Sequence, residues 1–115
     1  MARILRAISV KQPFVELILR GLKRAEYRSR LTNIRERVYL YASLKSRMKD
    51  RGWRQLRLQP DDLPTGTIAG SVEIAGCRRL PGGNGFAYLL KNLKRLRRPL
   101  KPTNQPQPGI WRPQF

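Results

Sequence analysis

The chain has 115 residues, the length of one domain with a single hydrophobic core. It carries 25 Lys and Arg against 7 Asp and Glu, a net charge of +18, with no His and one Cys. These counts exclude an internal disulfide, a zinc site made of His and Cys, and catalysis by Ser-His-Asp or Cys-His groups. We therefore predict a single domain over residues 1–115 without a metal or other cofactor.

The first elements are a strand and a short helix. Residues 4–10 (ILRAISV) are mostly apolar and β-branched, which predicts a buried strand. Apolar residues then recur at helical spacing over residues 13–20, with Pro13 in the first turn and Gly21 after the end, so we predict a helix there. The first apolar run breaks at Lys11 without a secretion cleavage site, and no stretch approaches 18 apolar residues, so we expect a cytoplasmic protein outside the membrane.

The middle of the chain predicts two strands and a weak helix. Residues 23–30 lack a helical apolar face and fit a strand, and residues 37–43 (RVYLYAS) alternate between aliphatic residues and tyrosines, which is typical of a strand. Residues 43–58 are rich in Lys and Arg and are interrupted by Gly52, so we expect a loose helix or helix-turn. Trp53 is expected to anchor this segment to the core.

The last third predicts a bent strand, an ambiguous segment and an irregular tail. Residues 67–77 (TIAGSVEIAGC) are rich in β-formers, and their two glycines indicate a bend or the close approach of another backbone. In residues 87–96, Leu89, Leu93 and Leu96 have helical spacing, so the pattern alone favours a cationic amphipathic helix. The proline-rich tail over residues 102–115 is expected to be irregular and partly anchored by Trp111. This order of elements favours an α+β fold built on a small mixed or antiparallel β-barrel.

Several motifs together resemble one known family. The opening AISVKQPFVELILRGLKRAEYR combines a strand, a Gln-Pro helix start and the pattern G-x-K-x-x-E-x-R; YLYAS, LPTGTIAGSVEI and a terminal G-x-W follow in order. This arrangement resembles the ASCH family (activating signal cointegrator homology domain), over nearly the whole chain. The resemblance implies a PUA-like α+β barrel with one or two helices covering its openings. It also implies that residues 87–96 form a strand, and we follow it there.

The resemblance implies two kinds of activity. Some relatives are thought to bind RNA, whereas others are similar to small amidohydrolases that remove acyl groups from the exocyclic amine of cytidine, and a ribonuclease activity is also attached to the family. In the amidohydrolase relatives a lysine and a glutamate carry catalysis, and Lys23 and Glu73 occupy the matching positions. Glu26 stands where those relatives have a hydroxyl, and Arg24 where the family often has threonine.

The chemistry of the residues around Lys23 supports a site at the barrel mouth. Crowding by cations disfavours the charged form of a lysine and makes its amine more nucleophilic. Glu73 is expected to share this cleft and to exchange a proton or neutralise the cluster; a purely structural salt-bridge set is the alternative. Strand alternation places Arg24, Glu26 and Arg28 on one face, so we predict that Glu26 orients both arginines toward a phosphate or a base edge. A solvent-facing row of charges is the alternative.

The remaining candidates are polar, aromatic and basic residues around the same mouth. Ser9 and Gln12 flank the start of the helix, where Gln12 either reads a base edge or satisfies backbone groups. Tyr39 and Tyr41 share one face of their strand, with Tyr27 as a candidate neighbour, and these tyrosines either stack on a base or pack in the sheet. Two basic runs, residues 51–57 and 91–101, predict a surface that follows a phosphate backbone, and they include the predicted ligand residues Arg95 and Arg98.

Three hypotheses about function follow. The first is an RNA- or nucleic-acid-binding domain with a nucleotide-sized cleft. The second is a hydrolase, either an amidohydrolase of acylated cytidine-type nucleosides or a ribonuclease. The third is an adaptor for which the charge is incidental. Under the first two hypotheses the expected partner is RNA or another nucleic acid, or a nucleoside, and the pattern of residues does not specify an oligomeric state.

Overall fold

The computed structural model describes residues 3–44 and 50–115. Its centre is one sheet with the strand order β2-β5-β4-β3-β1-β6, in which β1 and β3 are parallel and the other neighbours antiparallel. The strands are β1 (Ala7–Val10), β2 (Ala25–Arg28), β3 (Arg37–Ala42), β4 (Thr67–Arg79), β5 (Phe86–Leu100) and β6 (Ile110–Trp111). The described connections contain helices α1 (Phe14–Leu19) and α2 (Asp50–Gln55) and the 3-10 turns η1 (Pro60–Asp62) and η2 (Pro81–Gly83).

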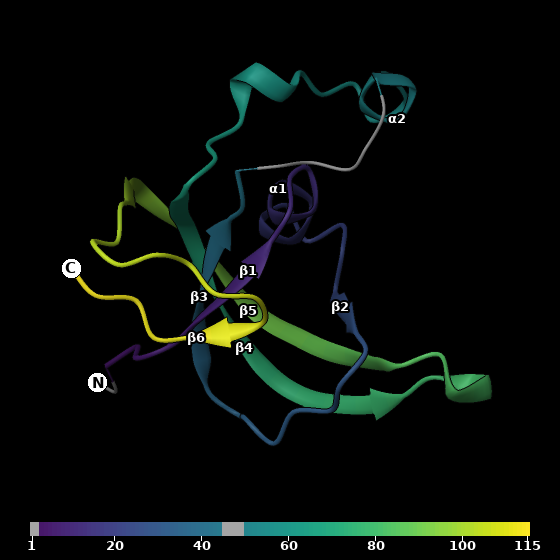
Figure 1. Ribbon diagram of the computed structural model, residues 1–115. Helices are drawn as coiled ribbons and strands as arrows, with labels where there is room; N and C mark the ends of the chain where they lie inside the picture. Colours follow the sequence, from purple (N-terminus) through teal and green to yellow (C-terminus); the bar gives the residue numbers. More distant parts are fainter. Residues whose placement is uncertain (1–2, 45–49) are drawn as a thin grey trace.

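The sheet curls into a half-barrel because its two longest strands bend. Figure 1 shows β4 and β5 as a long curved hairpin, with β2 beside the first residues of β5. The register of this hairpin shifts between Ile68 and Gly70 and again between Ile74 and Gly76. A Cβ at Gly70 would lie 2.6 Å from the carbonyl oxygen of Lys94, so only glycine allows this close approach. The predicted role of the glycines and the predicted α+β fold are both confirmed.

Helix α1 packs against the sheet and closes the hydrophobic core. Its apolar side contributes Val15, Ile18 and Leu19, which pack with aliphatic residues of β1, β3 and β4. The two faces of β3 separate as predicted: Leu40 and its aliphatic neighbours belong to this core, whereas Tyr41 packs in a second cluster with Trp111. The helix predicted over residues 13–20 is thus confirmed to within one residue at each end.

The strand over residues 86–100 contradicts the helical leucine pattern and confirms the expectation drawn from the family. Backbone pairing explains the outcome, because β5 is hydrogen-bonded to β4 on one side and to β2 on the other. Of the three leucines, Leu93 is 42% exposed and Leu96 joins the second cluster, so they do not share one buried stripe. Pairing with β4 therefore satisfies backbone groups along β5 as a helix would, and the separated leucines give no single apolar face that favours the helix.

Two further differences from the sequence prediction concern the ends of the chain and the second helix. The first strand begins at Ala7 rather than at residue 4. In the tail, Ile110–Trp111 forms β6, which pairs with β1, and both Trp53 and Trp111 are buried as expected of anchors. The weak helix predicted over residues 43–58 is present as α2, while residues 45–49 lie outside the described part of the chain. Within that part, no helix has the length and apolar character needed to span a bilayer.

Candidate functional site

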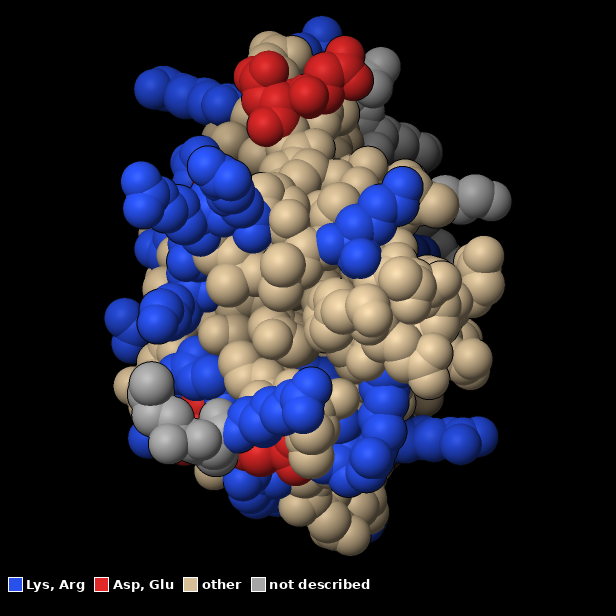
Figure 2. Space-filling view, turned by 90° about the vertical axis from the view of Figure 1, so that its left-hand side faces the viewer, with Lys and Arg blue, Asp and Glu red and all other residues tan. Residues whose placement is uncertain are grey.

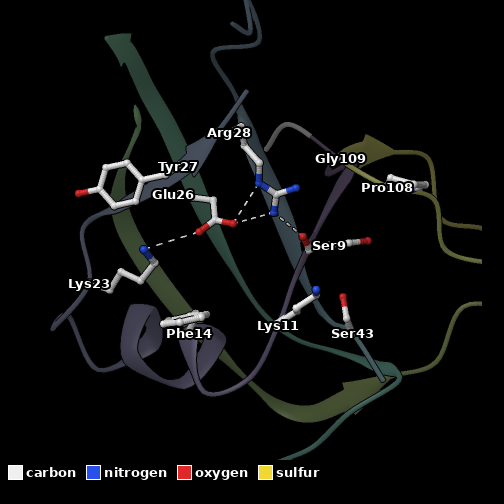
Figure 3. Close-up of a pocket in the computed structure, with 10 residues that line it drawn as sticks. All are labelled: Ser9, Lys11, Phe14, Lys23, Glu26, Tyr27, Arg28, Ser43, Pro108 and Gly109. Atoms are coloured by element: carbon white, nitrogen blue, oxygen red, sulfur yellow. Dashed lines mark hydrogen bonds and ion pairs between the residues drawn. The ribbon is translucent and has the colours of Figure 1, made fainter. Parts of the chain in front are cut away.

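A cleft of about 770 Å³ lies where β1, β2 and the C-terminal segment meet. Figure 3 shows that its lining comes from separate parts of the chain: the end of β1, the first turn of α1, β2 with the turn before it, the residue after β3, and the segment before β6. The lining residues are Ser9, Lys11, Phe14, Lys23, Glu26, Tyr27, Arg28, Ser43, Pro108 and Gly109. The volume is within the range of small-molecule sites, so the cleft has room for a nucleotide.

Glu26 organises the charges of this cleft. Its Oε2 accepts hydrogen bonds from Arg28 Nε at 3.0 Å and Arg28 Nη2 at 2.7 Å, and its Oε1 lies 3.7 Å from Lys23 Nζ. Arg28 Nη2 also donates to the backbone oxygen of Ser9, which ties β2 to β1 across the cleft. The Glu26 side chain is only 13% exposed, so both ion pairs are shielded from water more than surface pairs are. One acid therefore holds two cations in fixed directions.

Two aromatic rings flank the ammonium group of Lys23. Lys23 Nζ lies 4.7 Å from the ring centroid of Tyr27 and 5.4 Å from that of Phe14, both within the range of cation–π contact. Tyr27 is 59% exposed, an unusual exposure for a large ring beside a cleft. The cleft thus offers aromatic surface and fixed cations side by side. Among the described residues, His, Cys, Asp and Glu side chains do not gather in threes as a metal site.

Four of the predicted site residues are brought together here: Ser9, Lys23, Glu26 and Arg28. The hydroxyl of Ser9 donates to the backbone oxygen of Gln107 and accepts a hydrogen bond of 2.9 Å from Trp111 Nε1. Ser9 therefore holds the C-terminal segment over the cleft as well as lining it.

The prediction that Glu73 shares a cleft with Lys23 is wrong. Glu73 alternates along β4 with the core residues Val72 and Ile74, so its side chain projects from the outer face of the sheet. There its Oε2 accepts a hydrogen bond of 2.7 Å from Asn92 Nδ2 in β5. The acid that accompanies Lys23 in the cleft is Glu26.

The prediction that Glu26 binds Arg24 is also wrong. Strand β2 begins at Ala25, so the alternation used to place Arg24 does not extend to it, and its side chain is exposed. Lys23 is the second cation that pairs with Glu26.

Gln12 is buried, and its amide donates to the backbone oxygen of Pro64 and accepts from the backbone N–H of Glu16. Gln12 therefore satisfies backbone groups, which was the alternative to reading a base edge.

Tyr41, Arg95 and Arg98 lie outside the cleft. Tyr41 is buried and packs edge-on against Trp111, with ring centroids 5.4 Å apart, which is the packing alternative. Arg95 forms two hydrogen bonds with the carboxylate of Glu16, at 2.9 and 2.8 Å, and so fastens β5 to α1. Arg98 is exposed on β5.

Basic side chains are distributed around the molecule rather than confined to the cleft. On the face in Figure 2, Lys and Arg gather along the left side and the lower part, beside a central and right-hand region of mostly uncharged residues, and acidic side chains form one group at the top and another near the bottom. Strand β5 contributes a set of exposed cations that we call the β5 cations: Lys91, Lys94, Arg97, Arg98 and Lys101, the last directly after the strand. In the other basic run, Arg54 and Arg57 are exposed.

The sequence analysis missed half of the lining. Lys11 and Phe14 were assigned to the turn and to the apolar side of the helix, and Ser43 to the end of a strand. Pro108 and Gly109 lie in the tail that was expected to be irregular. For Pro108 and Gly109 the available signal was Trp111, since its pairing with Ala7 of β1 places the residues before it beside the first strand.

The curled six-stranded sheet with α1 against it defines an α+β fold of the PUA-like class. A family model of the ASCH domain matches residues 8–96, so the chain belongs to the ASCH domain family. A solved structure, that of ASCH from Zymomonas mobilis, is similar with a TM-score of 0.65 and 15% identity, over 93% of this chain and 85% of that chain. That likeness supports the fold alone. No curated protein sequence matches this chain.

Proposed function

We propose that this protein is an RNA-binding domain whose cleft holds one unpaired nucleotide. The observation that carries the proposal is the pairing of exposed aromatic surface, on Tyr27, with cations held by Glu26 inside a cleft of nucleotide size. Unpaired bases are typically recognised by stacking on aromatic rings while cations contact the phosphates. Membership of the ASCH family, which is generally associated with RNA binding, supports the same function.

The lining suggests how the parts of a nucleotide divide between the residues. The ring of Tyr27 offers a face on which a base stacks, and it does so without sequence preference because every base has a π-face. Lys11 and Lys23 supply positive charge inside the cleft, where a phosphate is attracted to them. The β5 cations then contact the phosphates that continue beyond the cleft.

The test is a binding titration with a short unstructured RNA, followed by fluorescence anisotropy. Tyr27→Ala removes the stacking surface and is expected to lower the affinity by about tenfold, since one base–aromatic stack contributes about 1–3 kcal/mol. Phe115→Ala is the matched control, because Phe115 is 62% exposed, close to the exposure of Tyr27, but lies outside the cleft. Equal losses in the two variants, or no binding by the unmodified protein, would overturn the proposal.

A second candidate function is hydrolysis, and one observation favours it: a lysine and a glutamate are paired in the cleft, with Glu26 in the place expected of Glu73. In this function the Glu26 carboxylate would accept or donate the transferred proton, and Lys23 would contact the reacting group of the substrate. Incubation with acylated cytidine and with unstructured RNA, followed by chromatography of the products, tests it. The expected result is turnover that Lys23→Ala abolishes and Glu73→Gln leaves unchanged; no turnover removes this candidate.

A further inference from the structure

A second cleft of about 600 Å³ adjoins the first. The two clefts share Arg28, Pro108 and Gly109, so they lie on either side of one boundary made by β2 and the C-terminal segment. Beyond this boundary, the second cleft is lined by the apolar and aromatic side chains of Leu31, Ile34, Tyr88 and Ile110 and by the polar residues Ser29, Arg30 and Thr32. The molecule therefore has two nucleotide-sized spaces in a row.

Arg28 presents an unused donor at the boundary between the clefts. Its Nε and Nη2 are occupied by Glu26 and by the backbone oxygen of Ser9. The remaining nitrogen, Nη1, makes no hydrogen bond with any residue in the described ranges 3–44 and 50–115, and in Figure 3 the outer end of the guanidinium points toward Gly109 and Pro108. Glu26 and Ser9 thus fix a guanidinium whose last donor faces the junction of the two clefts.

The second cleft offers apolar surface for a base, and the exposed Arg30 also lines it. Leu31 is 55% exposed and contributes open apolar surface. The hydroxyl of Tyr88 donates to the backbone oxygen of Arg30 at 2.7 Å and the side chain is buried, so Tyr88 contributes to the wall of the cleft and offers no free donor. Burial together with Cys77 and Glu26 raises the pKa of Tyr88, against a lowering by Arg28, so the phenol keeps the proton that it donates. Thr32 Oγ1 accepts the backbone N–H of Ile34 and is likewise engaged.

We propose that the two clefts bind two consecutive nucleosides of one RNA strand, with the phosphodiester between them on Arg28 Nη1. The inference rests on the proposed function and extends it: the ligand recognised is an internal step of a strand, not an isolated nucleoside. Three observations carry it, namely the continuity of the clefts, the unused donor at their boundary, and the exposed apolar surface of Leu31 in the second cleft.

The test compares two ligands that each carry one phosphate group. One is a nucleoside 5′-monophosphate, and the other is a dinucleoside monophosphate with a 2′-O-methyl group at the linkage, which prevents strand cleavage. Isothermal titration is expected to show the dinucleotide binding about tenfold more tightly, through one additional base contact. A methylphosphonate linkage, which has no charge, is expected to lose most of that gain because it gives Arg28 no anion.

Protein variants separate the second cleft from the first. Leu31→Ser, an exposed substitution that leaves the core intact, is expected to bring dinucleotide affinity down to that of the mononucleotide while leaving mononucleotide affinity unchanged. Leu100→Ser is the control, since Leu100 is also exposed but lies outside both clefts. Equal affinity for the two ligands, or a dinucleotide affinity insensitive to Leu31→Ser, would overturn the inference while RNA binding itself stands. Failure of the proposed function looks different, because then neither ligand binds.

Discussion

At the scale of single residues, each glutamate side chain is paired with a specific basic or polar group. Each of the four glutamates contacts such a group: Glu16 binds Arg20 and Arg95, Glu26 binds Lys23 and Arg28, Glu36 binds Arg6, and Glu73 accepts from Asn92. Glu26 stands apart from the others because its two partners line the main cleft. Removing its charge should therefore affect ligand binding more than removing the charge of another glutamate.

Glu26→Gln tests this difference. The substitution weakens the hold on Lys23 and Arg28, and hydrogen bonds between charged groups contribute about 1.5–3 kcal/mol, so mononucleotide affinity is expected to fall by about tenfold. Binding to inorganic polyphosphate, which has no base, is expected not to fall, because the net charge becomes more positive. Both affinities can be measured by isothermal titration.

Glu36→Gln is the matched control for this experiment. It removes the same charge and breaks a comparable ion pair, that of Arg6 Nη1 with Glu36 Oε1 at 2.6 Å, outside the cleft. A mononucleotide affinity that falls equally in both variants would show that Glu26 acts through overall charge and not through orientation.

At the scale of elements, the sequence predicted the strands where local pattern and pairing agree. Residues 37–43 alternate and lie in the middle of the sheet, so β3 was placed correctly to within one residue. The leucines of residues 87–96 follow a helical spacing, but pairing of β5 with strands from distant parts of the chain decides its structure. The pattern within one segment carries no information on its pairing partners. The prediction that this segment is a strand came from the family resemblance.

The candidate site was predictable only within one segment. Lys23, Glu26 and Arg28 were found because they lie within six residues, and alternation over β2 correctly paired Glu26 with Arg28. The position of Glu73 depends on which face of a bulged strand it occupies, and one of the register shifts between β4 and β5 falls between Ser71 and Glu73. The contribution of the C-terminal segment depends on the pairing of β6 with β1, which joins the two ends of the chain.

Glu16 also fastens helix α1 to strand β5, because its carboxylate accepts two hydrogen bonds from Arg95. Burial by itself raises the pKa of the Glu16 carboxyl, but hydrogen bonds and charges from Arg95 and Arg20 outweigh it, so the pKa lies below its ordinary value of 4.5. A carboxyl with a lowered folded-state pKa stabilises the fold above its unfolded-state pKa, and that stabilisation is lost as the pH falls through the folded-state value.

Glu16→Gln is therefore expected to lower the free energy of unfolding by about 1–3 kcal/mol at pH 7. The difference from the unmodified protein should shrink as the pH falls below about 4.5, because the unmodified carboxyl then becomes protonated. Urea unfolding at a series of pH values measures both effects. Glu73→Gln removes the same charge from the outer face of β4 and controls for net charge. A difference that stays constant down to acid pH would contradict the role given to the Glu16 ion pairs.

At the scale of the whole molecule, the cleft and the charged surface make separable contributions. The net charge of +18 attracts any polyanion, whereas the cleft distinguishes ligands that carry a base. Counterion release gives the first contribution a steep salt dependence, and stacking gives the second almost none. The two contributions can therefore be measured in the same titration series.

The final prediction uses this separation. If five or six phosphates contact the surface, log affinity for single-stranded RNA should fall against log salt with a slope of about −4. Replacing Arg97 and Arg98 together by Ala should make the slope shallower by about 1.4, since each lost phosphate contact removes about 0.7. Tyr27→Ala should lower the affinity at every salt concentration and leave the slope unchanged, because a stacked ring releases no counterions. A slope that responds to Tyr27 and not to the two β5 cations would place the phosphate contacts inside the cleft and contradict this division.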